Sequence, residues 1–60
     1  MTLTDGTTPD RDDSQVTLLM KWLLAEQAAL GGAANAANDP NPGDSRWVLI
    51  FKIARAKAGL

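Results

Sequence analysis

The chain of 60 residues contains no cysteine, no histidine and no tyrosine. Without cysteine it forms no disulfide, and without cysteine or histidine it lacks the usual sets of zinc ligands. Side chains that commonly serve as general bases or nucleophiles are therefore scarce, and every carboxylate except Glu26 falls in a predicted tail, cap or loop. We expect a protein that is not an enzyme, that holds no metal or cofactor, and that has no small-molecule substrate.

Segments that direct a protein to or through a membrane are also missing. Residues 1–13 carry four Asp and one Arg, whereas a secretory signal starts with basic residues and continues with an apolar stretch. The longest apolar segment, 16–30, includes Lys21 and Glu26 and is shorter than the roughly 20 apolar residues that cross a bilayer. We expect neither a signal peptide nor a transmembrane helix, and we favour a cytoplasmic or virion-associated location.

The small size of the chain predicts that its fold needs an additional source of stability. A domain of about 60 residues buries only about 60% of the surface that its unfolded chain exposes, so its stability is marginal. Natural chains of this size gain stability from disulfides, from a metal or from association. With the first two excluded, we predict self-association or binding to a larger protein.

The charges are divided between the two ends of the chain. Residues 1–15 carry a net −3, because four Asp stand against one Arg, while residues 45–60 carry +4 and no acid. The basic side chains of this last segment are Arg46, Lys52, Arg55 and Lys57. Such opposite ends suit association between copies, or a basic end that faces an anionic partner.

The first half of the chain predicts a tail and a helix. Residues 1–8 are polar and show no period that could bury a face, so we predict a flexible tail, with one domain over 9–60. Residues 10–30 are rich in helix formers and stop at two glycines, which predicts a helix with a glycine C-cap. Its candidate N-caps are Thr8, Asp12, Asp13 and Ser14.

The second half predicts a linker and a second helix. Residues 31–44 combine small residues with two prolines and predict a linker. A helix over 45–58, capped by Asp44 or Ser45, is favoured by its alanine-rich end. The alternative is a strand over 46–53, rich in β-branched and aromatic residues, that would add to a partner's sheet. We favour the helix, because a lone strand finds no mate within this chain.

The predicted fold is thus an all-α, two-helix hairpin with an N-terminal tail, completed by oligomerisation or by a partner. The apolar arc of helix 10–30 exceeds half of its circumference, and helix 45–58 carries two apolar stripes, so more than one packing surface is expected. We assign one stripe to helix 10–30 and the other to a partner. The predicted core or self-interface consists of Val16, Leu19, Trp22, Leu23, Trp47, Ile50 and Phe51. The predicted second binding face consists of Leu49, Ile53 and Leu60.

These features predict a structural or adaptor protein that self-assembles or binds a larger protein through apolar helix faces. Its size and chemistry would suit an accessory component of a virus or phage particle. A first alternative is a membrane-surface protein, because Trp47 and Phe51 with flanking basic residues resemble an interfacial amphipathic helix. A second is a small nucleic-acid-binding or regulatory protein whose four C-terminal basic side chains contact phosphates, although these residues do not share one face.

Overall fold

The computed structural model describes residue 9 and residues 11–60, and this part of the chain is entirely helical or irregular. Its elements are α1 (Gln15–Leu30), the short 3-10 turns η1 (Gly31–Ala33) and η2 (Ala36–Asn38), and α2 (Arg46–Lys57). The all-α class is confirmed. The alternative of a strand over 46–53 is wrong, since these residues belong to α2. The tail predicted for residues 1–8 lies outside the described residues.

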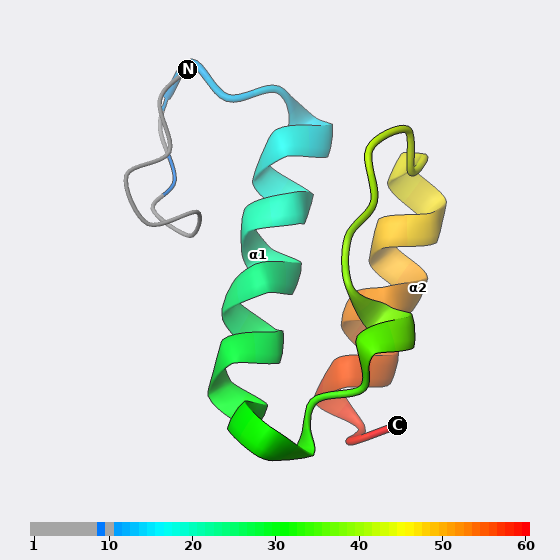
Figure 1. Cartoon of the computed structure of the whole chain (residues 1–60). Helices are drawn as coiled ribbons and strands as arrows, with labels where there is room; N and C mark the ends of the chain where they lie inside the picture. Colours follow the sequence, from blue (N-terminus) through cyan, green and yellow to red (C-terminus); the bar gives the residue numbers. More distant parts are fainter. Residues whose placement is uncertain (1–8, 10) are drawn as a thin grey trace.

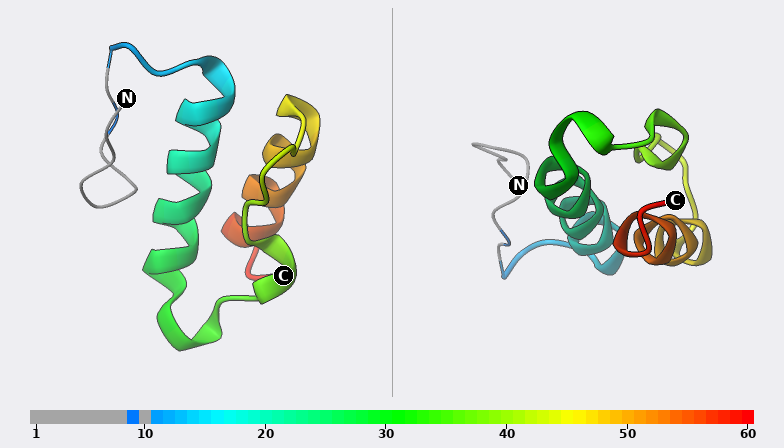
Figure 2. Two further views of the ribbon diagram at one scale, coloured as in Figure 1. Left: turned by 45° about the horizontal axis from the view of Figure 1, so that its top comes forward. Right: turned by 90° about the horizontal axis from the view of Figure 1, so that it is seen from below.

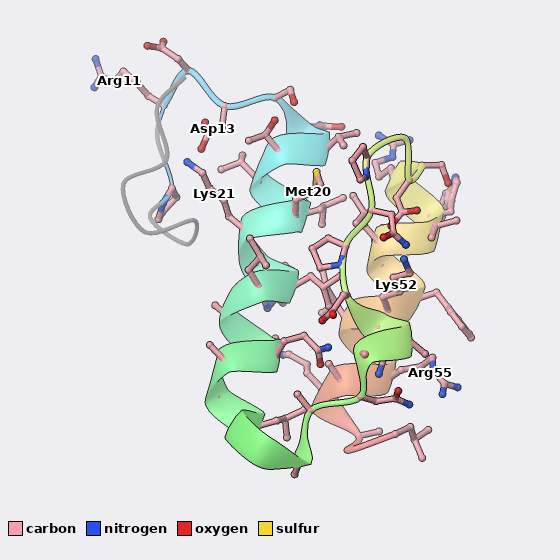
Figure 3. The ribbon with its side chains drawn as sticks, in the orientation of Figure 1. Arg11, Asp13, Met20, Lys21, Lys52 and Arg55 are labelled. Carbon is pink, nitrogen blue, oxygen red and sulfur yellow. The ribbon has the colours of Figure 1, made fainter. Side chains whose placement is uncertain are left out.

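Helix α1 begins at Gln15, five residues later than predicted, and ends where the glycines indicated. The hydroxyl of Ser14 caps it by accepting a hydrogen bond from the backbone N–H of Thr17 at 3.1 Å. Asp13 is not a cap, because its carboxylate pairs with the ammonium group of Lys21 (Figure 3). The side chains of this pair are 0% and 2% exposed, which holds the segment before α1 against the helix.

Helix α2 is capped at both ends by residues that directly flank it. The hydroxyl of Ser45 accepts a hydrogen bond from the backbone N–H of Val48 at 3.2 Å, so Ser45 rather than Asp44 is the N-cap. At the other end Gly59 has a φ of 76°, and the N–H of Leu60 reaches back to the carbonyl of residue 55 at 2.9 Å. This is the glycine-dependent Schellman arrangement that satisfies the last carbonyls of a helix.

The predicted pairing of the two helices is confirmed, and both helices run in the same direction (Figure 1). The chain descends through α1, returns through residues 31–45 alongside the pair, and descends again through α2. A hydrogen bond of 2.8 Å from Arg46 Nη1 to Gln15 Oε1 joins the first residues of the two helices. The long linker makes this direction possible, because fourteen residues can span about 46 Å when fully extended, while the sixteen-residue α1 along which the chain must return rises only about 24 Å.

The returning linker covers one side of the helix pair, as the view along the helices shows (Figure 2). The side chain of Gln27 is buried and holds the linker to α1. Its Nε2 donates to the carbonyl of Asn35 at 2.7 Å and to Oδ1 of Asp39 at 2.9 Å. From α2, Lys52 Nζ donates to the carbonyl of Asp39 at 3.0 Å. The linker is therefore tied to both helices by polar side chains.

Two further contacts fix the linker. The buried Asn38 in η2 accepts a hydrogen bond at Oδ1 from Arg55 Nε of α2, at 3.0 Å. Asn35 Nδ2 donates to the carbonyl of Leu60 at 2.8 Å, which ties the early linker to the end of α2. The linker thus acts as a third layer made of backbone and amide side chains. These hydrogen bonds hold the linker in one conformation although it contains no α-helix.

The apolar core is small and lies between the two helices. Its buried members are Leu23, Leu49, Ile53 and Ala56, and the partly buried Leu19, Met20 and Leu30 pack against them. No aromatic side chain belongs to the buried core of the described residues. The largest apolar side chains of the chain are consequently left on its surface.

Candidate functional site

All three aromatic side chains of the chain lie on the surface. The exposed fraction is 47% for Trp22, 72% for Trp47 and 63% for Phe51. Trp47 and Phe51 are four residues apart in α2 and therefore stand on one side of that helix. We call these two residues the aromatic face. Monomeric proteins seldom leave such side chains together in water unless a partner covers them.

The structure places the two predicted stripes of α2 the other way round. The stripe expected to meet helix 10–30 contains Trp47, Ile50 and Phe51, and all three are exposed. Leu49 and Ile53, which were assigned to a partner, are instead buried against α1. That part of the prediction is wrong, because a stripe that includes the small Ala56 lets the helices approach closely, whereas an indole would hold them apart.

The remaining residues of the predicted sites divide between the core and the surface. Leu23 is buried and Leu19 packs against the core, as expected for core residues. The predicted core or interface residues Val16 and Trp22 are exposed, and so is Leu60 from the predicted second face. Whether the exposed members form an interface stays a prediction.

A shallow groove runs between the two helices on the side that the linker leaves open. Leu18 and Leu19 of α1 and Ile50 of α2 line it, and Gln15 and Arg46 stand at one end. Its volume is about 330 Å³. We call this feature the groove. Leu18 was not among the predicted site residues, although its place in the wide apolar arc of α1 indicates an apolar side chain available to a second contact.

Each exposed aromatic ring has a cation beside it. The charged group of Arg46 lies 5.8 Å from the ring centroid of Trp47, and that of Arg55 lies 5.7 Å from Phe51. The ammonium of Lys57 reaches from α2 to α1 and lies 5.2 Å from the centroid of Trp22. Cations within about 6 Å of a ring are attracted to its face. Trp47 and Phe51 thus lie beside positive charge, whereas the Nε1 of Trp22 also donates to the carboxylate of Glu26 at 3.3 Å.

The four basic residues of α2 are used in two different ways. Lys52 Nζ forms an ion pair with Asp44 at 2.7 Å. This hydrogen bond from Lys52, together with one from the backbone N–H of Asn41, holds the pKa of Asp44 below its ordinary value. The other three cations meet no carboxylate within ion-pair distance in the described part of the chain: Arg46, Arg55 and Lys57.

Sequence reasoning missed the buried pair formed by Lys21 and Asp13. The periodicity of α1 placed Lys21 in a polar strip beside Ser14 and Thr17, and nothing in that pattern marks a partner that precedes the helix. In the structure both side chains of the pair are nearly inaccessible. Breaking a buried ion pair by removing one member is costly, so this pair is assigned to the stability of the fold rather than to a site.

The described residues offer little for other kinds of site. Among residues 9 and 11–60 there is no group of acidic side chains arranged to hold a metal ion. Neither α1 nor α2 combines the length and apolar character required to cross a bilayer. The groove and the aromatic face are therefore the candidate binding surfaces. Comparison with protein-family models, with curated proteins and with solved structures finds no match to this chain.

Proposed function

We propose that the chain is a non-enzymatic structural or adaptor protein that binds protein surfaces through the aromatic face and the groove. The observation that carries this proposal is the exposure of all three aromatic side chains, Trp22, Trp47 and Phe51. Aromatic residues and arginine are enriched in the buried centres of protein interfaces and supply much of their binding energy. Burying these rings against a partner would remove a large apolar area from water.

The small core supports the same proposal. Only four apolar side chains of the described residues are buried between α1 and α2, and a core of this size supplies little stability on its own. Association would bury Trp47, Phe51 and Ile50 without disturbing that core, because all three lie on its outer side. An accessory subunit of a virus particle is one form that such an assembly role would take.

Sedimentation over a concentration series tests the self-assembly branch of the proposal. We expect the sedimentation coefficient to rise with concentration, and the double variant Trp47→Ser with Phe51→Ser to remove the rise. Leu60→Ser is the control, since Leu60 is also exposed but lies beyond the end of α2, outside both the aromatic face and the lining of the groove. A protein that stays monomeric throughout and also fails to bind an amphipathic helical peptide would overturn the proposal.

A membrane-surface role is the second candidate. It is favoured by the cations beside the three exposed rings, because aromatic and basic side chains together suit the headgroup region of a bilayer. Co-sedimentation with phosphatidylserine-containing vesicles tests it, with phosphatidylcholine vesicles as the control. If the protein stays in solution with both, this candidate is excluded.

Nucleic-acid binding has less support. It was expected to use the four basic residues of the last helix, and one of them, Lys52, is occupied by Asp44 and by the linker. Arg55 donates to Asn38 on the linker side, Arg46 stands at one end of the groove, and Lys57 lies over the ring of Trp22. A labelled duplex whose binding does not weaken steeply with added salt would exclude this alternative.

A further inference from the structure

Leu18, Leu19 and Ile50 form the apolar middle of the groove, and Arg46 stands at one end of it. A second cation, Lys57, does not line the groove but lies seven residues beyond Ile50 on α2. At one end Arg46 of α2 donates to Gln15 of α1 at 2.8 Å, and further along the pair Lys57 of α2 reaches Trp22 of α1. On an α-helix, positions 46, 50 and 57 fall within about 40° of one another, so these three residues share one side of α2. The two cations lie about 16 Å apart along the helix axis.

Neither of these two cations forms an ion pair within the described part of the chain. Arg46 meets an amide oxygen and an indole ring. Lys57 meets the ring of Trp22, whose Nε1 donates to the carboxylate of Glu26 at 3.3 Å. On the linker side the chain provides Lys52 with its own carboxylate, Asp44. Arg46 and Lys57 have no carboxylate at ion-pair distance within the described residues. Both cations are therefore available to form ion pairs with carboxylates of a partner, and Arg46 is the one that lines the groove.

From this arrangement we infer that the groove binds an acidic amphipathic helix of another protein, an inference that rests on the proposed function. A third helix can lay a ridge of apolar side chains between two helices that lie side by side. Its apolar residues would cover Leu18, Leu19 and Ile50. Two carboxylates about eleven residues apart on such a helix would span the same distance of about 16 Å and meet Arg46 and Lys57.

Other occupants fit these features less well. Two copies joined groove to groove around a twofold axis would bring Arg46 of one against Lys57 of the other, and like charges in an interface are unfavourable. A flat bilayer cannot follow the hollow between two helices, and a nucleic acid would place phosphates over the apolar middle. An acidic helix satisfies both the apolar middle and the two cations.

Fluorescence anisotropy with a labelled probe peptide tests the inference. The probe is an alanine-rich helix of about eighteen residues, long enough to be partly helical, with leucines at i, i+4 and i+7 between two glutamates eleven residues apart. One control peptide carries lysine in place of both glutamates, and a second carries serine in place of the leucines. We expect the glutamate peptide to bind, both controls to bind at least about tenfold more weakly, and added salt to weaken the binding.

A charge-reversed variant sharpens the test. Lys57→Glu should weaken binding of the glutamate peptide about tenfold and strengthen binding of the lysine peptide. Arg11→Glu changes the net charge by the same amount outside the groove and should leave both affinities unchanged. The peptide exchange on the unaltered protein needs no variant, so it stands even if Lys57→Glu disturbs the end of α2.

The outcomes separate this inference from the proposed function. Equal affinity for the glutamate and lysine peptides, or no binding of either, overturns the inference. If the protein nevertheless self-associates through Trp47 and Phe51, the proposed function stands without the acidic helix. Binding to phosphatidylserine vesicles that depends on Lys57, in the absence of peptide binding, would also overturn the inference in favour of a membrane.

Discussion

Arg46 Nη1 donates a hydrogen bond to Gln15 Oε1 at 2.8 Å, and this bond joins the first residue of α2 to the first residue of α1. The contact requires the two helices to start at the same end of the molecule. It also closes one end of the groove. This pair of side chains is therefore part of the contact that sets the parallel direction of the helices and also part of the candidate binding surface.

Cross-linking tests the direction of the helices. The chain has no cysteine, so Gln15→Cys with Arg46→Cys introduces a single reactive pair. We expect a short bismaleimide to link these two positions within one molecule, as detected by mass spectrometry. The pair Gln15→Cys with Lys57→Cys should not be linked, because residue 57 lies about 16 Å further along α2. Preferential linking of 15 to 57 would mean that the helices run in opposite directions.

Truncation of Leu49 should destabilise the fold far more than truncation of Trp47. Leu49 is fully buried, so Leu49→Ala should lower the free energy of unfolding by about 2 to 5 kcal/mol. Trp47 is 72% exposed, so Trp47→Ala should change it by about 0.5 kcal/mol or less. Urea unfolding at a concentration where the protein is monomeric measures both. Equal losses would contradict the observed assignment of the two stripes.

The glycines after α1 should respond differently to alanine. Gly31 has φ 57° and ψ −127°, a conformation that strains a residue with a Cβ, so Gly31→Ala should cost about 1 kcal/mol or more. Gly32 has no positive φ and nothing within 4 Å of an added Cβ, so Gly32→Ala should be neutral or stabilising. Thermal unfolding of the two variants checks this difference. A larger loss of stability for Gly32→Ala than for Gly31→Ala would contradict the backbone conformation described for the end of α1.

Asp44 should make stability depend on pH in the acid range. Its pKa is held below the ordinary value, chiefly by the hydrogen bond from Lys52, so the unfolded chain binds a proton more readily than the folded one. The contribution is therefore complete above the ordinary aspartate pKa of about 4 and is lost as pH falls through the lower pKa of the folded state.

The variant Asp44→Asn isolates that contribution. Its amide oxygen can still accept from the N–H of Asn41, but the ion pair with Lys52 is gone. We expect its stability to fall less steeply than that of the unaltered protein between about pH 5 and pH 2, as followed by circular dichroism. Lys52→Gln, which removes the other member of the pair, should flatten the profile in the same way. Unchanged profiles in both variants would contradict the assigned role of the pair.

Local signals in the sequence predicted both helices and the end of α1, and the reasons are chemical. Ser14 and Ser45 cap because a hydroxyl reaches the free N–H groups of the next turn, and Gly31 ends α1 because it adopts a positive φ. The early start at residue 10 failed because Asp13 turns to Lys21 instead of extending the helix. That contact joins residues outside any helical period, so no pattern indicates it.

The hydrophobic pattern of the sequence could not predict how the two helices pack or in which direction α2 runs. Both stripes of α2 are apolar enough to pack on α1, and the choice depends on volumes that a helical wheel does not contain. The small Ala56 and the linker amide of Asn38 fit beside the buried stripe, which leaves Ile50 for the groove. The direction of α2 depends on the path of the linker, which is set by amide contacts such as those of Gln27.

Two helices that run the same way add their electrical effects instead of cancelling them. Each helix carries about half a positive charge at its N-terminus and half a negative charge at its C-terminus, so the end of the molecule with Gln15 and Arg46 gains about one positive charge from the backbone alone. The opposite end becomes negative by the same amount. An approaching acidic chain would therefore be turned toward the end marked by Arg46 before any side chain is in contact.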